Sequence, residues 1–158
     1  MRPIVWIGRR KVDCLRHADP RGVWPIRVAA HAFGKGRPVR DLYLSPEHAV
    51  FSHGVLIPVR ELVNGRSIVQ MFPAQVEYWH IELDAHDVLL AERLAAESYL
   101  ENGARCDFDN HDALTLHPMF AQSEHGLPCV PILRQGVLVE AARAHVDART
   151  PKVARQGA

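Results

Sequence analysis

The stretch Asp41–Pro58, DLYLSPEHAVFSHGVLIP, decides how this chain folds. It contains three apolar runs, Leu42–Leu44, Ala49–Phe51 and Val55–Ile57, and the residues between them include a proline and a glycine. Short apolar runs separated by turn-forming residues are typical of consecutive β-strands. The stretch therefore predicts strand, tight polar turn, strand, turn and strand, and it favours a mostly β protein.

The first of these turns, Ser45-Pro46-Glu47-His48, carries a hydroxyl and an imidazole three residues apart. A Ser and a His that are fixed on a rigid turn between buried strands can orient a carbonyl group and move a proton. The spacing S-x-x-H also occurs often by chance, so its meaning depends on the rest of the chain.

The composition indicates one folded domain with a tail. The chain has 158 residues, of which 47% are hydrophobic and 23% charged, and its formal net charge is +1. A packed core is expected, and the balanced charge gives no indication of nucleic-acid binding. No stretch approaches the roughly 20 apolar residues that a membrane span needs. The first residues, MRPIVWIGRRKVD, show no secretory signal, so a cytoplasmic location is the default expectation.

The three cysteines, Cys14, Cys106 and Cys129, are odd in number and far apart in sequence. A disulfide framework is therefore not expected, and no C-x-x-C pair indicates zinc. Cys14 has Arg16 and His17 near it in sequence, and a cationic neighbourhood lowers the pKa of a thiol. Cys14 is either a reactive nucleophile or, the interpretation that we favour, an ordinary free thiol.

Further strands are expected on both sides of the deciding stretch, over residues 4–7, 23–33, 67–71, 76–83 and 88–91. Asn64-Gly65 is a strong turn pair and predicts a hairpin whose second strand is Ser67–Met71. The apolar alternation changes phase at Trp79-His80, which indicates a β-bulge.

Two helices are expected in the second half of the chain, a short one over residues 92–101 and an amphipathic one over 137–148. Asn102-Gly103 is expected to form a turn rather than a succinimide. The predicted organisation is a first domain, residues 1–103, followed by an irregular extension, residues 104–158, that ends in a helix and a frayed tail.

Several segments, taken in order, resemble the Hint domains of hedgehog proteins and inteins, and in particular their bacterial group. The matching segments are WIGRR (6–10), VWPIRV (23–28), RDLYLSP (40–46), HAVF (48–51), GVLIPVRELVNG (54–65), YWHIELDAHDVLLAE (78–92) and AESYLENG (96–103). The family shares a strand followed by T-x-x-H and another apolar strand. Here Ser45 stands where Thr is usual and His48 stands at the His. The resemblance implies the mostly β, horseshoe-like Hint fold.

The resemblance also implies a reaction, the rearrangement of a peptide bond to a thioester that leads to self-cleavage or splicing. His48 would protonate the nitrogen of the scissile bond, and Ser45 would help to hold its carbonyl. His80 stands where inteins usually carry Asp, and His86 matches the His of a late motif. Supporting catalytic roles are implied for both, against the alternative that they are idle polar residues. No cofactor is implied.

Hint domains begin with the nucleophilic Cys and a few strands before the region that resembles Arg2–Arg10. The sequence therefore resembles the later part of a Hint domain, incomplete at its N-terminus, and we expect it not to process itself alone. Its expected partners are its own chain or a complementary N-terminal Hint segment. The alternative is a protein-binding module, either one half of a split Hint pair or a decayed β scaffold. Open strand edges would favour self-association.

Metal binding is the rival hypothesis for the same side chains. If the Hint fold applies, His48, His80 and His86 converge near one site, and two or three histidines close in space bind zinc. Because the sequence has no H-x-H or H-x-x-x-H pair among them, no metal ion is expected.

Overall fold

The computed structural model describes residues 2–100, 107–110 and 127–149. In this part of the chain the structure is mostly β, as predicted, with antiparallel strands arranged in three sheets. None of the described helices is long and apolar enough to span a membrane. The predictions for Cys106, for Asn102-Gly103 and for the end of the chain lie outside the described residues.

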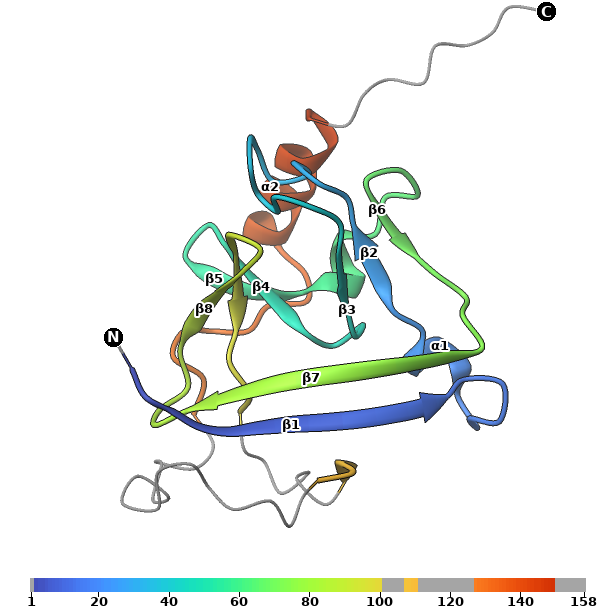
Figure 1. Ribbon diagram of the computed structural model, residues 1–158. Helices are drawn as coiled ribbons and strands as arrows, with labels where there is room; N and C mark the ends of the chain where they lie inside the picture. Colours follow the sequence, from blue (N-terminus) through green and yellow to red (C-terminus); the bar gives the residue numbers. More distant parts are fainter. Residues whose placement is uncertain (1, 101–106, 111–126, 150–158) are drawn as a thin grey trace, which may run out of the picture.

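The longest strands form a two-stranded ribbon. They are β1 (Ile4–Asp13) and β7 (Gln75–Leu83). A three-stranded sheet has the order β3 (Leu42–Leu44), β2 (Ile26–Val28) and β6 (Ile68–Gln70). A four-stranded sheet has the order β5 (Val55–Pro58), β4 (Ala49–Ser52), β9 (Leu94–Glu97) and β8 (Val88–Ala91). Figure 1 shows the ribbon along one side of the molecule and the two smaller sheets rising from it.

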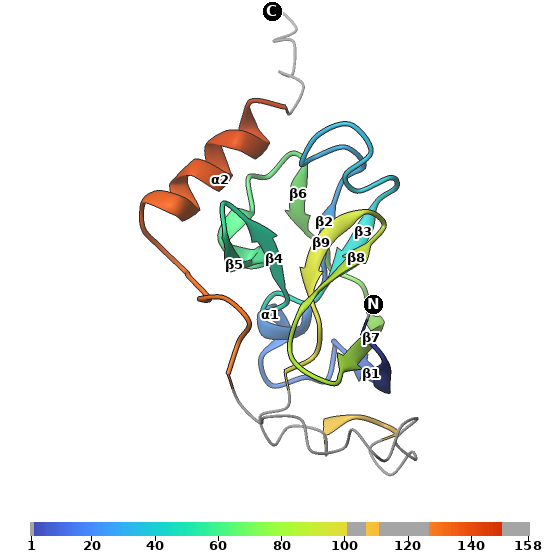
Figure 2. The same ribbon diagram turned by 90° about the vertical axis from the view of Figure 1, so that its left-hand side faces the viewer.

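Three helices complete the described part of the chain: α1 (Pro20–Val23), the 3-10 helix η1 (Val59–Leu62) and α2 (Val137–Asp147). Figure 2 shows α2 on the outer side of the molecule, beside β4 and β5. Its buried residues, Val139, Ala142 and Val146, pack in one core cluster with residues of β2, β4 and β5. Apolar burial between the two smaller sheets and α2 is therefore the main stabilising contact of the fold.

A second, smaller cluster lies on the ribbon and consists of Val5, Trp6 and Phe108, with Tyr99 packed against it. Gly8 is needed here, because a Cβ at this position would lie 2.2 Å from the Trp6 ring. Because Gly8 has no side chain, the Trp6 indole can lie over it. The strand β1 continues through Gly8 to Asp13. The strand predicted over residues 4–7 was too short.

The deciding stretch folds as predicted, into β3, β4 and β5. The strand predicted over residues 88–91 and the C-terminal helix are also confirmed. The strand predicted over 23–33 is reduced to β2, and its first residue, Val23, ends α1 instead.

Three other predictions were wrong. The hairpin at Asn64-Gly65 does not form, because β6 pairs with β2 and the chain before the turn is η1. The helix predicted over 92–101 is replaced by a two-residue turn, Glu92-Arg93, and by β9. The bulge at Trp79-His80 is absent, since the register of β1 and β7 is regular there and shifts between Ile4 and Trp6.

Candidate functional site

A cleft of about 250 Å³ lies between β3, the turn that follows it and β7. Three of the predicted site residues, Ser45, His48 and His80, line this cleft, and Glu97 at the end of β9 joins them. Two exposed aromatic side chains stand at its rim, Tyr43, 53% exposed, and Trp79, 60% exposed. The structure thus brings a hydroxyl, two imidazoles and a carboxylate to one partly apolar hollow.

Backbone hydrogen bonds hold the turn that carries Ser45 and His48. The His48 amide donates to the Ser45 carbonyl over 3.0 Å and closes the turn. On its other side η1 is bonded to the same turn, because Val59 donates to the His48 carbonyl over 3.0 Å and Arg60 to the Pro46 carbonyl over 3.1 Å. The turn is therefore fixed between β3, β4 and η1, and the side chains of Ser45 and His48 start from a rigid backbone.

His80 reaches the cleft from β7. Its ring centroid lies 5.4 Å from that of His48, 5.8 Å from that of Tyr99 and 5.3 Å from that of Phe108. Along the first part of β7 the residues Val76, Tyr78 and His80 are more buried than Gln75, Glu77 and Trp79, and Glu82 further along the strand is buried as well. Polar residues thus occupy inward positions, which explains why the apolar alternation seemed to change phase without a bulge.

Burial lowers the pKa of both imidazoles. For His80 the loss of water is the largest cause, the neighbouring His48 adds to it, and the pKa falls to about 4. For His48 burial again lowers the pKa, while the Glu97 carboxylate and a backbone hydrogen bond with Glu97 oppose it. Both rings are therefore neutral at neutral pH, so each has one nitrogen that can donate a proton and one that can accept it.

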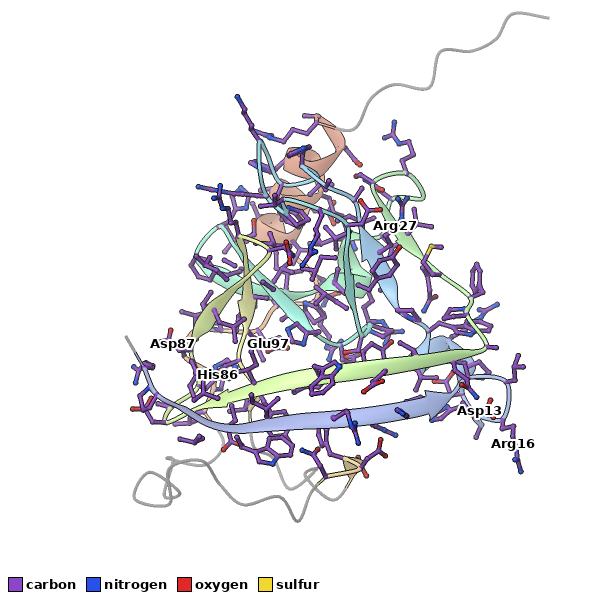
Figure 3. All side chains as sticks on the ribbon, in the orientation of Figure 1. Asp13, Arg16, Arg27, His86, Asp87 and Glu97 are labelled. Atoms are coloured by element: carbon purple, nitrogen blue, oxygen red, sulfur yellow. The ribbon has the colours of Figure 1, made fainter. Side chains whose placement is uncertain are left out.

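Glu97 connects the cleft to His86. One carboxylate oxygen, Oε1, accepts a hydrogen bond from the Ala49 amide over 2.6 Å. The other, Oε2, faces Nε2 of His86 at 3.7 Å, and the His86 side chain is only 3% exposed. His86 does not line the cleft itself; it lies behind Glu97, at the Leu83 end of β7, where Figure 3 shows the two side chains together.

Glu97 was not predicted as a site residue. The sequence favoured a helix there, because Ala, Leu and Glu have high helix propensity. The signal that could have found it is the alternation of buried Leu94, Ala96 and Ser98, which has the period of a strand and sets Glu97 apart as the polar residue between them.

The cysteines of the described segments do not reach the cleft. Cys14 is fully buried, and burial raises the pKa of its thiol, which favours the ordinary thiol over the nucleophile. Burial also raises the pKa of Cys129, and neither residue lines the cleft. Among the described residues no three His, Cys, Asp or Glu side chains are arranged to hold a metal ion.

A larger hollow, of about 860 Å³, lies at the far end of β4, beside Ser52 and His53. It contains none of the predicted site residues. The smaller cleft is the better candidate, because it combines a hydroxyl with two imidazoles whose pKa values are lowered by burial.

The Hint domain family model matches residues 1–103 of the chain, which include every residue of the cleft. No curated protein and no solved structure matches the chain.

Proposed function

The chain belongs to the Hint domain family. From this premise we propose that the cleft is the site of an autoprocessing reaction, in which the acyl group of a peptide bond moves from nitrogen to the sulfur of a thiol. The observation that supports this most is the convergence of Ser45, His48 and His80 on one cleft, because the turn after β3 and the strand β7 are about thirty residues apart in sequence. The Hint family is one of autoprocessing modules; the roles of these residues are our proposal.

The proposed step needs no cofactor. The sulfur of a cysteine attacks the carbonyl carbon of the peptide bond before it, the carbon–nitrogen bond breaks, and a thioester forms. The neutral His48 ring takes the thiol proton and delivers it to the departing nitrogen, so its own charge is restored. Ser45 donates a hydrogen bond to the carbonyl oxygen as negative charge develops there.

His80 and Glu97 have supporting roles in this proposal. His80 packs beside His48 and keeps that side of the cleft poor in water. Glu97 carries the negative charge that counters the effect of burial on His48, and it therefore keeps the pKa of His48 closer to the neutral range that a proton-transfer group needs. His86 lies behind Glu97, with Nε2 3.7 Å from the carboxylate, and supports it by this polar contact and not by a hydrogen bond.

None of the cysteines in the described segments lines the cleft, and we propose that the nucleophile is supplied by a complementary Hint segment. Two features of the rim support this source. Tyr43 and Trp79 expose aromatic surface on both sides of the cleft, and β3 is an edge strand of its sheet. Exposed apolar surface beside an open strand edge favours the addition of another strand.

The test joins a reporter peptide and the Cys-led segment of a Hint domain to the front of the 158-residue chain. Mass spectrometry after incubation with dithiothreitol should show release of the reporter at the bond before the cysteine. The 158-residue chain alone should remain one species under the same conditions. Its shortening at a defined bond would contradict the proposed source of the thiol.

Adding the Cys-led segment as a separate molecule distinguishes the two forms of partnership. Cleavage in this mixture identifies the chain as one half of a split pair. Cleavage only in the fused form indicates that the segment must be covalently attached. If neither form is cleaved although both fold, the autoprocessing proposal is wrong and the decayed, protein-binding scaffold becomes the better interpretation.

A further inference from the structure

We propose that residues 127–134 form a strap that supports the site from behind at two places, at His86 on one side and at the Ser45–His48 turn on the other. The strap lies beyond the segment that the family model matches. Its proposed consequence for the reaction depends on the function proposed above, but its structural effect on His86 can be measured without any cleavage.

The middle of the strap lies along the outer edge of β5. Ile132 forms a parallel bridge with Leu56, the Leu56 amide donates to the Pro131 carbonyl over 3.0 Å, and the Leu133 amide donates to the Leu56 carbonyl over 2.8 Å. Figure 2 shows this segment leading up to α2. Because Leu56 is fully buried, the strap is bonded to a rigid strand and not to a surface loop.

One end of the strap determines the state of the His86 ring. The Cys129 amide donates to Nδ1 of His86 over 3.0 Å, so Nδ1 must present its lone pair. In the neutral ring the proton is then on Nε2, the nitrogen that faces the Glu97 carboxylate at 3.7 Å. A backbone amide of the strap thus directs the His86 proton toward the carboxylate that borders the cleft.

The other end of the strap holds the turn of Ser45 and His48. Arg134 donates to the Glu47 carboxylate over 2.6 Å, and Arg60 bonds the same carboxylate from η1. Burial raises the pKa of Glu47, but the two arginine hydrogen bonds outweigh it, and the pKa lies below its ordinary value. Glu47 is the residue next to His48, so this double contact restrains the turn from outside the cleft.

The helix that follows fixes the strap in place. Val139 and Val146 of α2 are buried in the main core, and Arg143 donates to the Glu61 carbonyl of η1 over 2.6 Å. The strap is therefore anchored at its middle by β5 and after its end by α2. These contacts lie one layer behind the reacting groups, and a misplacement of about 1 Å caused by a change far from the reacting atoms can lower the rate by about 100-fold.

The decisive comparison is Cys129→Pro with Cys129→Ala. Proline lacks the amide hydrogen, whereas alanine keeps it and removes only the thiol. Nitrogen-15 NMR of the full chain, with labelled histidine, should show His86 as the Nε2–H form in the wild type and in Cys129→Ala. In Cys129→Pro both neutral forms of the ring should be populated. A wild-type ring protonated on Nδ1, or an unchanged ring in folded Cys129→Pro, would overturn the proposal.

A measurement on the wild type covers the case in which Cys129→Pro does not fold. A nitrogen–nitrogen coupling across the hydrogen bond from Cys129 to His86 should be detected, and its absence counts against the strap. In the complemented fusion, the chain joined to the reporter and the Cys-led segment as described above, folded Cys129→Pro should process about tenfold more slowly than Cys129→Ala. A fusion that is inactive in every variant contradicts the proposed function alone, because the NMR result is independent of cleavage.

The other end has its own pair of variants. Arg134→Gln should raise the pKa of Glu47 toward its ordinary value and speed the exchange of the His48 amide hydrogen. Arg93→Gln, which changes an exposed arginine in the turn between β8 and β9, should change neither. Equal behaviour of the two variants would show that Arg134 does not restrain the turn.

Discussion

At the scale of single residues, His80 illustrates how the site combines polarity with burial. It is an inward-facing residue of β7 that packs among aromatic rings, and its pKa falls to about 4. The unfolded chain restores the ordinary value of 6.5. Between these two pH values the unfolded state binds a proton that the folded state does not bind, so the stability of the fold must decrease as the pH falls.

This gives a prediction for the pH dependence of stability. The free energy of unfolding should decrease by about 3 kcal/mol between pH 6.5 and pH 4 on account of His80, since each unit of pKa shift corresponds to about 1.4 kcal/mol. His80→Phe should show a shallower decrease, with the remainder due in part to His48. Urea unfolding at several pH values measures both curves, and parallel curves would contradict the assignment.

Glu97 has two functions that substitutions can separate. Glu97→Gln keeps an oxygen for the Ala49 amide and removes the charge, whereas Glu97→Ala removes both. We expect Glu97→Ala to lose about 1–3 kcal/mol more stability than Glu97→Gln, because it leaves a buried amide without its partner. Chemical unfolding measures this difference. Both variants should slow processing by the complemented fusion, and wild-type rates in Glu97→Gln would show that the charge has no role.

At the scale of elements, the residues that define β3, β4 and β5 could be read from the sequence, because their apolar runs and turns are local signals. Ser45, His48 and His80 could be predicted as a group only through the family resemblance, since the ribbon and the smaller sheets meet through long-range contacts. The prediction of a helix over 92–101 was wrong, because the strand pairing of Ala96 with Val50 and Leu89 outweighs helix propensity.

Contacts with other elements also explain why η1 forms after β5. Val59 and Leu62 are buried three residues apart, as in a 3-10 helix, and this short helix packs on the turn of His48. Glu97 and the strap escaped prediction for a similar reason, because their partners, Ala49 and Leu56, are distant in sequence.

The turn between β8 and β9 offers a stabilising change. Arg93 has a φ of 66°, a conformation that costs an L-residue about 1 kcal/mol and costs glycine nothing. Arg93→Gly should therefore raise the melting temperature, as measured by thermal unfolding. The control Ala95→Gly, in the regular part of β9, should lower it, because glycine weakens a strand interior. A lower melting temperature for Arg93→Gly would contradict the strain argument.

At the scale of the whole molecule, α2 belongs to the same core as the segment that the family model matches. Val146 is 1% exposed and packs with residues of the two smaller sheets, whereas Val137 in the same helix is 85% exposed. Val146→Ala should destabilise the whole chain by about 2 kcal/mol, because it removes buried methyl groups and leaves a cavity. Val137→Ala should change stability by less than about 0.5 kcal/mol.

The stability of Val146→Ala and Val137→Ala is measured by urea unfolding, followed both by tryptophan fluorescence and by circular dichroism. A single transition that shifts in Val146→Ala, with the two probes coincident, indicates one cooperative unit. Two separate transitions, of which only one responds, would mean that α2 folds apart from the sheets.

The claim that His48 transfers the proton in an acyl shift is tested most directly by the rate of reporter release from the complemented fusion, compared between His48→Asn and His53→Asn. The two histidines flank β4 at opposite ends, and only His48 lines the cleft. The rate should be at least about 100-fold lower for His48→Asn and within about twofold of the wild type for His53→Asn. Equal rates in the two variants, both folded, would contradict it.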